Sequence, residues 1–247
     1  MSISGHPVNR LISPPLMARD SLTCNVCPVR EIAACAALDH REREELARLG
    51  HHRTLRRGET LSAAGDENAL SATLITGALK VSSFDEDGTE RILSLIHPAG
   101  FAGELFAPAA NHDIVALTDA ELCVFPRQQY EQAIERFPAL GRALLRRSSN
   151  DLLESRALLA AVTGRTALQR IAAFLLALAR AASPHRGVRA PRFDLVLTRG
   201  EIAALLGITI ETVSRQLTKL EQDGVIRREG VRRIHLDDPA RLESLAS

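Results

Sequence analysis

The stretch of residues 198–224 constrains the fold of this chain more than any other part of the sequence. It begins with Thr198 and Glu201, which form a capping box at the start of a short helix with one apolar face. Gly207 ends that helix, and Thr209 can cap a second, longer helix. Two short helices joined by a tight, glycine-containing turn are typical of a helix-turn-helix unit.

The second helix of this unit has one face for packing and another for recognition. The recognition face carries Glu211, Ser214 and Arg215 near the N-terminal end, the part of such a helix that reaches base edges in the major groove of DNA. Arginine can donate two hydrogen bonds to guanine, glutamate can accept from the cytosine amino group, and serine can serve either kind of partner. The alternative is an exposed Glu211–Arg215 ion pair that stabilises the helix by about 0.2–0.5 kcal/mol. The packing face consists of Val213, Leu217 and Leu220.

The segment after this helix adds basic residues. Val225 to Ile234 is predicted to form a hairpin with basic edges, a wing whose arginines can meet phosphates. From Thr198 onward the chain has eight Lys/Arg and eight Asp/Glu, and the whole chain has a formal net charge of +1. A DNA-binding surface must therefore be local, and salt should weaken binding to it.

Four cysteines form a second feature with chemical consequences. Cys24, Cys27 and Cys35 fall within twelve residues, and Cys123 lies about ninety residues later in an apolar stretch. Four thiolates can hold a zinc ion or an iron–sulfur cluster. A structural zinc site usually uses two short Cys pairs. One pair and two single cysteines favour the bulkier cluster.

Other roles for these cysteines remain open from the residues alone. Cys123 can be a buried thiol that only packs, and Cys24-x-x-Cys27 can be a dithiol redox pair, although no βαβ pattern surrounds it. Disulfides are disfavoured because nothing indicates an oxidising compartment.

No apolar run is long enough for a signal peptide or a membrane span, so we expect a cytoplasmic protein without a membrane partner. His51-His52 is the one adjacent histidine pair, and no set of nucleophile, base and orienting residue suggests an enzyme.

Between the cysteine segment and residue 125 the pattern is first helical and then that of strands. Asp39 and Glu42 predict a capped helix that stops at Gly50. Turn signals then recur about every ten residues, the rhythm of an all-β sandwich or barrel. Within it we expect a hairpin around Asp85 to Gly88, with the glycine left-handed, and a last strand at Leu122 to Phe125.

A long helix is predicted from Pro138 to Ala161. The leucines recur every seven residues, but the intervening positions of the seam hold serine, so the helix can pair with a second copy without pairing tightly. The alternative is that the leucines pack on the β region. These seam residues are Leu145, Leu152 and Leu159 with Ser148 and Ser155.

A hinge is expected at Thr163 to Thr166, before an apolar helix over residues 167–181 and a loop over Ser183 to Arg192. The buried side of the apolar helix should carry Ile171, Phe174, Leu175 and Leu178.

A β roll, a long helix and a winged helix-turn-helix with Glu211-Thr-Val-Ser214-Arg215 together resemble the cyclic-AMP receptor protein/FNR superfamily of bacterial transcription regulators over about residues 20–240. The cysteine spacing is similar to that of its oxygen-sensing FNR branch, including the FnrN and FnrL types. The resemblance implies an α+β fold with an N-terminal β roll of the jelly-roll (double-stranded β-helix) type, a dimerisation helix and a C-terminal winged helix-turn-helix.

What the resemblance implies about function is specific. Cys24, Cys27, Cys35 and Cys123 would bind an oxygen-labile [4Fe-4S] cluster, and the homodimer would bind palindromic double-stranded DNA through Glu211, Ser214 and Arg215. We expect Thr198 and Thr209, at the two helix starts, to belong to the DNA-binding site as well. The acidic turn at residues 85–87 would contact RNA polymerase. The rival is a zinc-stabilised, redox-inert DNA-binding or interaction protein of the same fold.

Two departures from the family pattern matter. Seven residues separate Cys27 from Cys35, more than in the enteric form, so the loop and its sensitivity to oxygen can differ. Nucleotide-binding members follow Gly-Glu with an Arg-Ser pair, but here Gly103-Glu104 is followed by Asn111-His112-Asp113-Ile114, so a cyclic nucleotide is not expected.

We therefore expect four segments. They are an N-terminal arm with the cysteines (1–36), a β-roll sensor domain (37–137), a dimerisation helix (138–163) and a winged helix-turn-helix DNA-binding domain (164–247).

Overall fold

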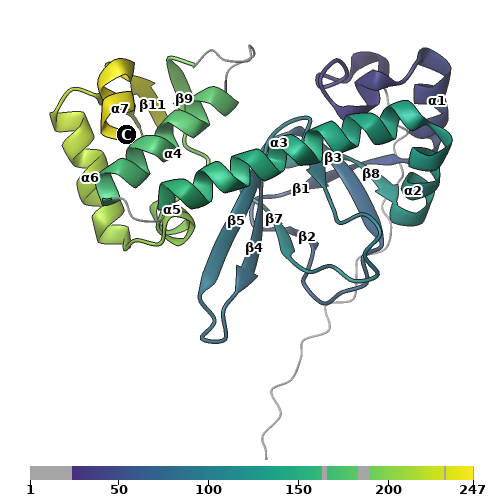
Figure 1. Ribbon diagram of the computed structural model, residues 1–247, viewed down its shortest axis with the longest axis horizontal. Helices are drawn as coiled ribbons and strands as arrows, with labels where there is room; N and C mark the ends of the chain where they lie inside the picture. The colour runs from purple at the N-terminus through teal and green to yellow at the C-terminus, as the bar shows by residue number, and fades with distance from the viewer. Residues whose placement is uncertain (1–23, 163–165, 183–189, 231, 247) are drawn as a thin grey trace, which may run out of the picture.

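The computed structural model describes residues 24–162, 166–182, 190–230 and 232–246. A long helix, α3 (Pro138–Val162), runs across the molecule from the cysteine segment and the β roll to the C-terminal helical unit (Figure 1). Within the described ranges no helix is long and apolar enough to cross a membrane. The predicted α+β class, with a β roll, a long helix and a winged helix-turn-helix, is confirmed.

The β roll consists of two four-stranded antiparallel sheets. One has the order β1-β8-β3-β6 and the other β2-β7-β4-β5. Alternate residues of each strand point inward, so the two sheets enclose an apolar core in which Leu74, Leu122 and Val124 are fully buried. The strands are β1 (His51–Leu55), β2 (Thr60–Ser62), β3 (Leu70–Thr76), β4 (Leu79–Phe84), β5 (Glu90–Ile96), β6 (Phe101–Ala102), β7 (Asp113–Ala116) and β8 (Ala120–Pro126).

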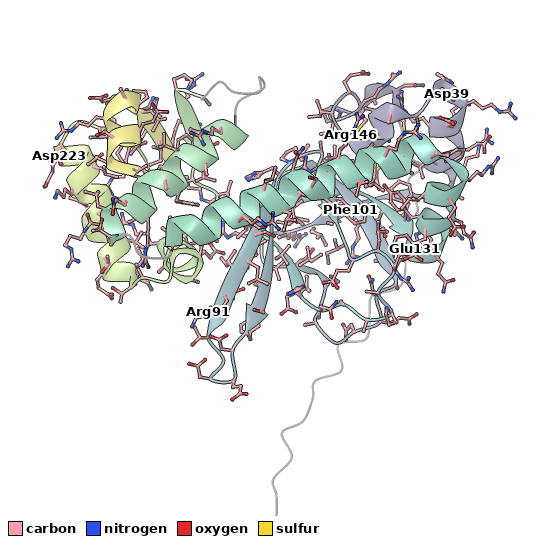
Figure 2. All side chains as sticks on the ribbon, viewed as in Figure 1. Asp39, Arg91, Phe101, Glu131, Arg146 and Asp223 are labelled. Atoms are coloured by element: carbon pink, nitrogen blue, oxygen red, sulfur yellow. The ribbon has the colours of Figure 1, made fainter. Side chains whose placement is uncertain are left out.

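The predicted hairpin is confirmed. β4 and β5 pair from Leu79↔Ile96 to Phe84↔Glu90, and Gly88 in the turn has a φ of 78°, a backbone conformation that suits glycine. The hairpin projects away from α3 (Figure 1), and the labelled Arg91 lies on its free part (Figure 2).

Helices cover one end of the roll, where the cysteine segment also lies. The segment forms two short 3-10 helices, η1 (Cys24–Val26) and η2 (Ala34–Ala37), and is followed by α1 (His40–Leu49), with α2 (Arg127–Arg136) after the roll. The predicted capping box of Asp39 and Glu42 is present at the start of α1. Gly50 ends α1, but its φ of −112° shows that no left-handed cap is used.

The first turns of α3 pack on this end of the molecule, whereas its later leucines do not. Leu140 and Leu144 are buried beside α1 and α2. Leu145 is 72% exposed and Leu152 is 50% exposed, so the alternative that the seam leucines pack on the roll is wrong for these two. Ser148 and Ser155 are exposed as well, and the side chain of Leu159 lies outside the described residues. In Figure 2 the labelled Arg146 marks this exposed stretch of α3.

The C-terminal unit begins with α4 (Ala167–Ala181), which confirms the predicted apolar helix. Thr166 and Gln169 form its capping box, and the rest of the expected hinge, residues 163–165, lies outside the described residues. The expected buried side is confirmed, since Ile171, Phe174, Leu175 and Leu178 are all buried.

The expected loop over Ser183 to Arg192 is wrong at its end. Arg192 starts β9 (Arg192–Asp194), which pairs with β11 (Arg233–Leu236) and buries Phe193, so the wing hairpin of β10 (Ile226–Glu229) and β11 is part of a three-stranded sheet. Residues 183–189 of that loop lie outside the described residues. Two helices, α5 (Arg199–Leu206) and α6 (Ile210–Gln222), form the helix-turn-helix, and α7 (Pro239–Ala246) packs on α4.

The C-terminal unit is docked on the roll. Ala78, Ile92 and Leu117 of the roll are buried in the same apolar cluster as α4, α5 and α6. Polar contacts reinforce this interface, because Arg57 Nη2 lies 3.2 Å from Glu201 Oε2 and Lys80 Nζ lies 3.9 Å from Glu201 Oε1. Glu201 thus links the first helix of the helix-turn-helix to the roll.

A double-mutant cycle tests this link. Arg57→Ala and Glu201→Gln should show a coupling free energy of about 0.5–1 kcal/mol in urea denaturation, because the pair is only partly exposed. Glutamine at position 201 keeps the capping box, so the change reports the lost charge rather than a broken helix start. Arg56→Ala, on the exposed neighbouring residue, is the control and should be additive with Glu201→Gln; additivity for Arg57→Ala as well would contradict the link.

Candidate metal centre and nucleic-acid interface

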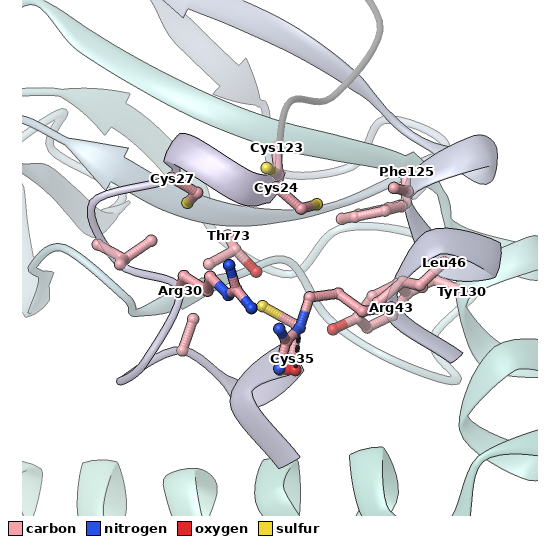
Figure 3. Close-up of a pocket in the computed structure, with 13 residues that line it drawn as sticks. Cys24, Cys27, Arg30, Cys35, Arg43, Leu46, Thr73, Cys123, Phe125 and Tyr130 are labelled. Atoms are coloured by element: carbon pink, nitrogen blue, oxygen red, sulfur yellow. Dashed lines mark hydrogen bonds between the residues drawn. The ribbon is translucent and has the colours of Figure 1, made fainter. Parts of the chain in front are cut away.

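The structure brings the four cysteines to the wall of one cavity (Figure 3). They arrive from separate elements: Cys24 from η1, Cys27 from the turn that follows it, Cys35 from η2 and Cys123 from β8. All four are free and partly buried, so none forms a disulfide. A local segment and a strand almost a hundred residues away therefore share one site.

The cysteine segment is fixed to the roll by apolar contacts. Val29 and Ala33 are each 4% exposed and pack with Ile75 and Ala99 of the roll, next to the cysteines. Burial of a side chain such as Val29 contributes about 1.5–3 kcal/mol. Apolar packing therefore helps to hold the segment against the roll.

Cys123 stands on the most rigid part of the site. Its strand β8 lies inside a sheet, where Cys123 is directly opposite His52 of β1 and Thr73 of β3. A residue with a paired strand on each side has little freedom to move. Any adjustment of the site must therefore come from the segment that carries the other three cysteines.

The thiols of Cys24, Cys35 and Cys123 are disfavoured as thiolates unless a cation joins them. Burial, followed by the proximity of the other three cysteines, raises the pKa of Cys123 well above its ordinary value. Burial also raises the pKa of Cys24 and of Cys35, although the positive charge of Arg43 opposes this rise at both. A metal binds the deprotonated form and would supply the missing positive charge.

Two arginines line the cavity and were not predicted from the sequence. Arg43 donates from Nε to the carbonyl of Cys35 at 3.2 Å and from Nη2 to that of Leu38 at 2.9 Å, which ties η2 to α1. Arg30 Nε is buried without a hydrogen-bond acceptor among the described residues, although it lies 3.4 Å from Oε1 of the exposed Glu31. A buried N–H without a hydrogen bond is costly, and the exposed Glu31 carboxylate does not provide one, so an anionic group in the cavity would fit beside this donor. A thiolate-ligated cluster carries such negative charge, and the donor set is therefore compatible with one.

The cysteines are not arranged around a single ion. Within the described residues no group of three or more His, Cys, Asp and Glu side chains is arranged to hold a metal ion. A zinc ion with bonds of about 2.3 Å to sulfur would need the four sulfurs at roughly 3.8 Å from one another. The cavity itself has a volume of about 30 Å³, room for about two water molecules. A larger group would therefore require the segment of residues 24–35 to shift outward.

The cysteine segment also contacts the long helix. Directly after η2, Leu38 is 3% exposed and shares a buried cluster with Leu140 and Leu144 of α3. η2 itself, which carries Cys35, lies against α3. A shift of Cys35 would thus reach α3 through one layer of packed side chains.

The helix-turn-helix forms as its caps predict. Thr198 accepts a hydrogen bond from the backbone of Glu201 at the start of α5, and Thr209 accepts one from the backbone of Thr212 at the start of α6. Gly207 between them is left-handed, with a φ of 62°. The caps shape the two helix starts and do not themselves identify a DNA contact.

The three predicted base-reading residues share an accessible face of α6. Glu211 and Arg215 are exposed, and Ser214 is half-buried. Hydrogen bonds from its own backbone N–H and from Thr209 lower the pKa of Glu211, so its carboxylate bends toward the helix start. The alternative Glu211–Arg215 ion pair is not formed among the described residues. Instead, Ser214 accepts a hydrogen bond from Arg199, a residue that sequence reasoning missed.

Most wing arginines already have acidic partners. These pairs partly neutralise the positive charge of the wing, whereas Arg232 is exposed and has no acidic partner in the part of the chain that is described. The pairs are Arg227–Asp237, Arg228–Glu221 and Arg233–Asp194.

Comparison with known proteins identifies the family. A model of the Crp-like helix-turn-helix domain matches residues 169–245, and a model of the cyclic nucleotide-binding domain matches residues 52–137. The chain is 36% identical over 222 residues to the transcriptional activator protein FnrL of Cereibacter sphaeroides, covering 89% of this chain and 90% of that protein. The chain belongs to the cyclic-AMP receptor protein/FNR (CRP/FNR) superfamily of transcription regulators.

Two further matches agree with this CRP/FNR assignment. The chain is 34% identical over 226 residues to a probable transcriptional activator of Rhizobium leguminosarum bv. viciae, covering 92% of this chain and 94% of that protein. The solved structure of FixK2 from Bradyrhizobium japonicum has a TM-score of 0.73 at 25% identity and covers 80% of this chain and 98% of that chain. Like its CRP/FNR relatives, this protein is a DNA-binding transcription regulator and not an enzyme.

In the loop between β6 and β7, the side chain of Glu104 is engaged by other residues of the same loop. The Glu104 carboxylate accepts hydrogen bonds from the Asn111 backbone at 3.1 Å and from the Asn111 side chain, and it lies 2.9 Å from His112 Nδ1. Its oxygens are therefore satisfied from within the chain.

The packing of η2 against α3 gives a direct stability test for this CRP/FNR regulator. Leu38→Ala should lower the free energy of unfolding by about 2–5 kcal/mol, because it opens a cavity between the cysteine segment and α3. Urea denaturation of the metal-free protein measures the effect. Ile32→Ala is the matched control in the same segment; its side chain is 69% exposed, so the change should stay within about 0.5 kcal/mol. Equal effects of the two changes would show that the segment is not packed as described.

Proposed function

We propose that this protein is an oxygen-responsive transcription regulator that binds a [4Fe-4S] cluster through Cys24, Cys27, Cys35 and Cys123. The observation that carries the proposal is the convergence of all four cysteines on one cavity. The similarity to FnrL over nine-tenths of both chains supports it. The seven-residue spacing before Cys35 is accommodated by the buried turn that contains Val29 and Ala33.

The residues around the sulfurs suit an anionic cluster. Thiolates are the usual protein ligands of such clusters, and the arginines at positions 30 and 43 provide positive charge at the cavity wall. When bound, the cluster would supply an iron–sulfur core that oxygen can dismantle. Arg43 would hold Cys35 in position through its hydrogen bond to the Cys35 carbonyl, and Cys123 would anchor the site to the roll.

The signal then passes to α3. Ligation of a cluster by Cys35 together with Cys123 would displace η2 outward from the roll, because the cavity is too small for it, and η2 packs on α3 beside Leu38 and Leu140. The exposed seam of Leu145 and Leu152, with Ser148 and Ser155 and in line with Leu159, would form a homodimer of marginal stability. Marginal stability is required, because a ligand shifts an equilibrium only by its preference for one state.

The dimer would act on DNA in the cytoplasm. Two copies of α6 would enter successive major grooves of a palindromic site, with half-sites roughly 34 Å apart. Glu211, Ser214 and Arg215 would contact base edges, while Thr198 and Thr209 hold the helix starts in position. The exposed acidic turn at residues 85–87 would contact RNA polymerase, as the family resemblance implies.

We do not propose a cyclic nucleotide as the effector. Between Gly103 and Ile114 the chain has no Lys or Arg to neutralise a phosphate. Glu104 is already engaged by Asn111 and His112.

Metal and sulfide analysis of anaerobically purified protein tests the cofactor. We expect a brown protein with about four iron and four sulfide per chain, which bleaches in air. Replacing Cys123 with Ser should remove the colour while leaving the fold intact, because the serine keeps the size of the side chain. A colourless protein with one zinc per chain would instead establish the rival, a redox-inert zinc protein.

Substitutions in the seam test the dimer. Ser148→Leu with Ser155→Leu should produce dimers that persist in air, because the added apolar groups complete the leucine seam. Sedimentation velocity before and after exposure to air measures the monomer fraction. Asn150→Leu, about 140° around the helix from Leu145, adds an exposed leucine outside the seam and should leave the response to air unchanged. An unchanged monomer content in the double variant would count against α3 as the dimer helix.

A further inference from the structure

Ser214 on the recognition helix is held by a residue of the preceding helix. Arg199 Nη1 donates a hydrogen bond to Ser214 Oγ at 3.1 Å. Arg199 is the first residue of α5, directly after the cap Thr198, and its side chain is exposed. The bond therefore crosses from α5 to the face of α6 that also carries Glu211 and Arg215.

The guanidinium of Arg199 is not committed to an acidic partner among the described residues. Glu201, the acidic residue of the same helix start, is engaged elsewhere: it accepts from the Thr198 backbone at 2.6 Å and lies 3.2 Å from Arg57. A guanidinium has five N–H donors in a fixed plane. One of them holds Ser214, and the rest stay available for the DNA backbone.

The hydrogen bond from Arg199 determines whether the Ser214 hydroxyl donates or accepts a hydrogen bond when it meets a base. A hydroxyl has two acceptor lone pairs and one donor hydrogen. The Ser214 oxygen already accepts a hydrogen bond from the positively charged Arg199, so the hydroxyl hydrogen points away from Arg199. A second hydrogen bond accepted by the same oxygen would be weaker because of the nearby positive charge. Ser214 is thus prepared to donate to a base edge.

We propose that Arg199 is a positioning residue that makes Ser214 a hydrogen-bond donor and so sets sequence preference at one base pair of each half-site. As a donor, Ser214 selects acceptor edges, which are thymine O4, guanine O6 and purine N7, and it disfavours the cytosine amino group. The inference rests on the proposed contact between Ser214 and DNA. It differs from a plain phosphate contact, which would strengthen binding to every sequence alike.

Selection from a random palindromic DNA library, followed by sequencing, tests this inference with the full-length protein prepared anaerobically with iron and sulfide. The parent is compared with Arg199→Ala, Ser214→Ala and the double variant at several salt concentrations. We expect Arg199→Ala and Ser214→Ala to reduce the preference at the same base-pair position by about three- to tenfold, the range of one hydrogen bond. The double variant should lose no more preference there than Ser214→Ala alone, because the two residues act as one unit.

A different pattern would overturn the inference. Arg199→Ala could instead weaken binding to all sequences equally and lower the salt dependence by about one phosphate contact. If its effect on the binding free energy also adds to that of Ser214→Ala, Arg199 only contacts the DNA backbone. Arg232→Ala is the matched control, since it removes an exposed cation from the wing without touching α6, and it should leave every base preference unchanged. Arg199→Lys keeps the charge but not the planar fork, so it should retain the salt dependence and lose part of the preference.

Failure of the proposed function appears differently in the same experiment. A parent protein that selects no palindrome contradicts the regulator proposal, whereas a parent that selects one while Arg199→Ala keeps its full preference contradicts the role of Arg199. Thermal melts of each variant verify that it is folded.

Discussion

The contact between η2 and α3 is the interaction on which the regulatory account depends. Cys35 lies in η2, and Leu38 directly after it is buried against Leu140 and Leu144 of α3. On its other side the cysteine cavity is closed by β8, a strand with a partner on each flank. Because β8 is held on both sides, a change in the sulfur site is taken up by the segment of residues 24–35, and its η2 end can pass the change to α3 through Leu38.

The C-terminal unit is docked on the roll, so a displacement of α3 would also affect how this unit is held. α3 leads toward α4, and the C-terminal unit shares an apolar cluster with Ala78, Ile92 and Leu117 of the roll. Glu201 belongs both to the cap of α5 and to the ion pair with Arg57. Contacts with the roll therefore help to set the orientation of the recognition helix, and the hydrogen bond from Arg199 to Ser214 links the first helix of this unit to the recognition face.

Much of the fold could be predicted from the sequence, because local signals fixed it. The capping boxes at Asp39 and Thr198, the left-handed Gly207 and the hairpin at Gly88 each depend on residues a few positions apart. Strand β9 could not be predicted, because Phe193 is strand-like only through its pairing with Ile234 about forty residues away. The 3-10 helices of the cysteine segment likewise depend on packing against Ile75 and Ala99.

Some residues of the two candidate sites could be predicted from the sequence, and others could not. Cysteine spacing identified the four thiols, and helix periodicity placed Glu211, Ser214 and Arg215 on one face. The arginines that surround the thiols were missed, since their approach to the cavity depends on how the segment folds back on itself. Arg199 was missed for a similar reason, although its place directly after a predicted cap, at the start of the helix before the recognition helix, was a usable signal.

The most direct test of the central claim follows dimerisation and the cluster in one sample. Anaerobic protein is examined by sedimentation velocity while its iron–sulfur absorbance is recorded, and air is then admitted. The account predicts that loss of absorbance and conversion of dimer to monomer occur together. A dimer that persists after the cluster is gone, or a monomer that already carries the cluster, would contradict it.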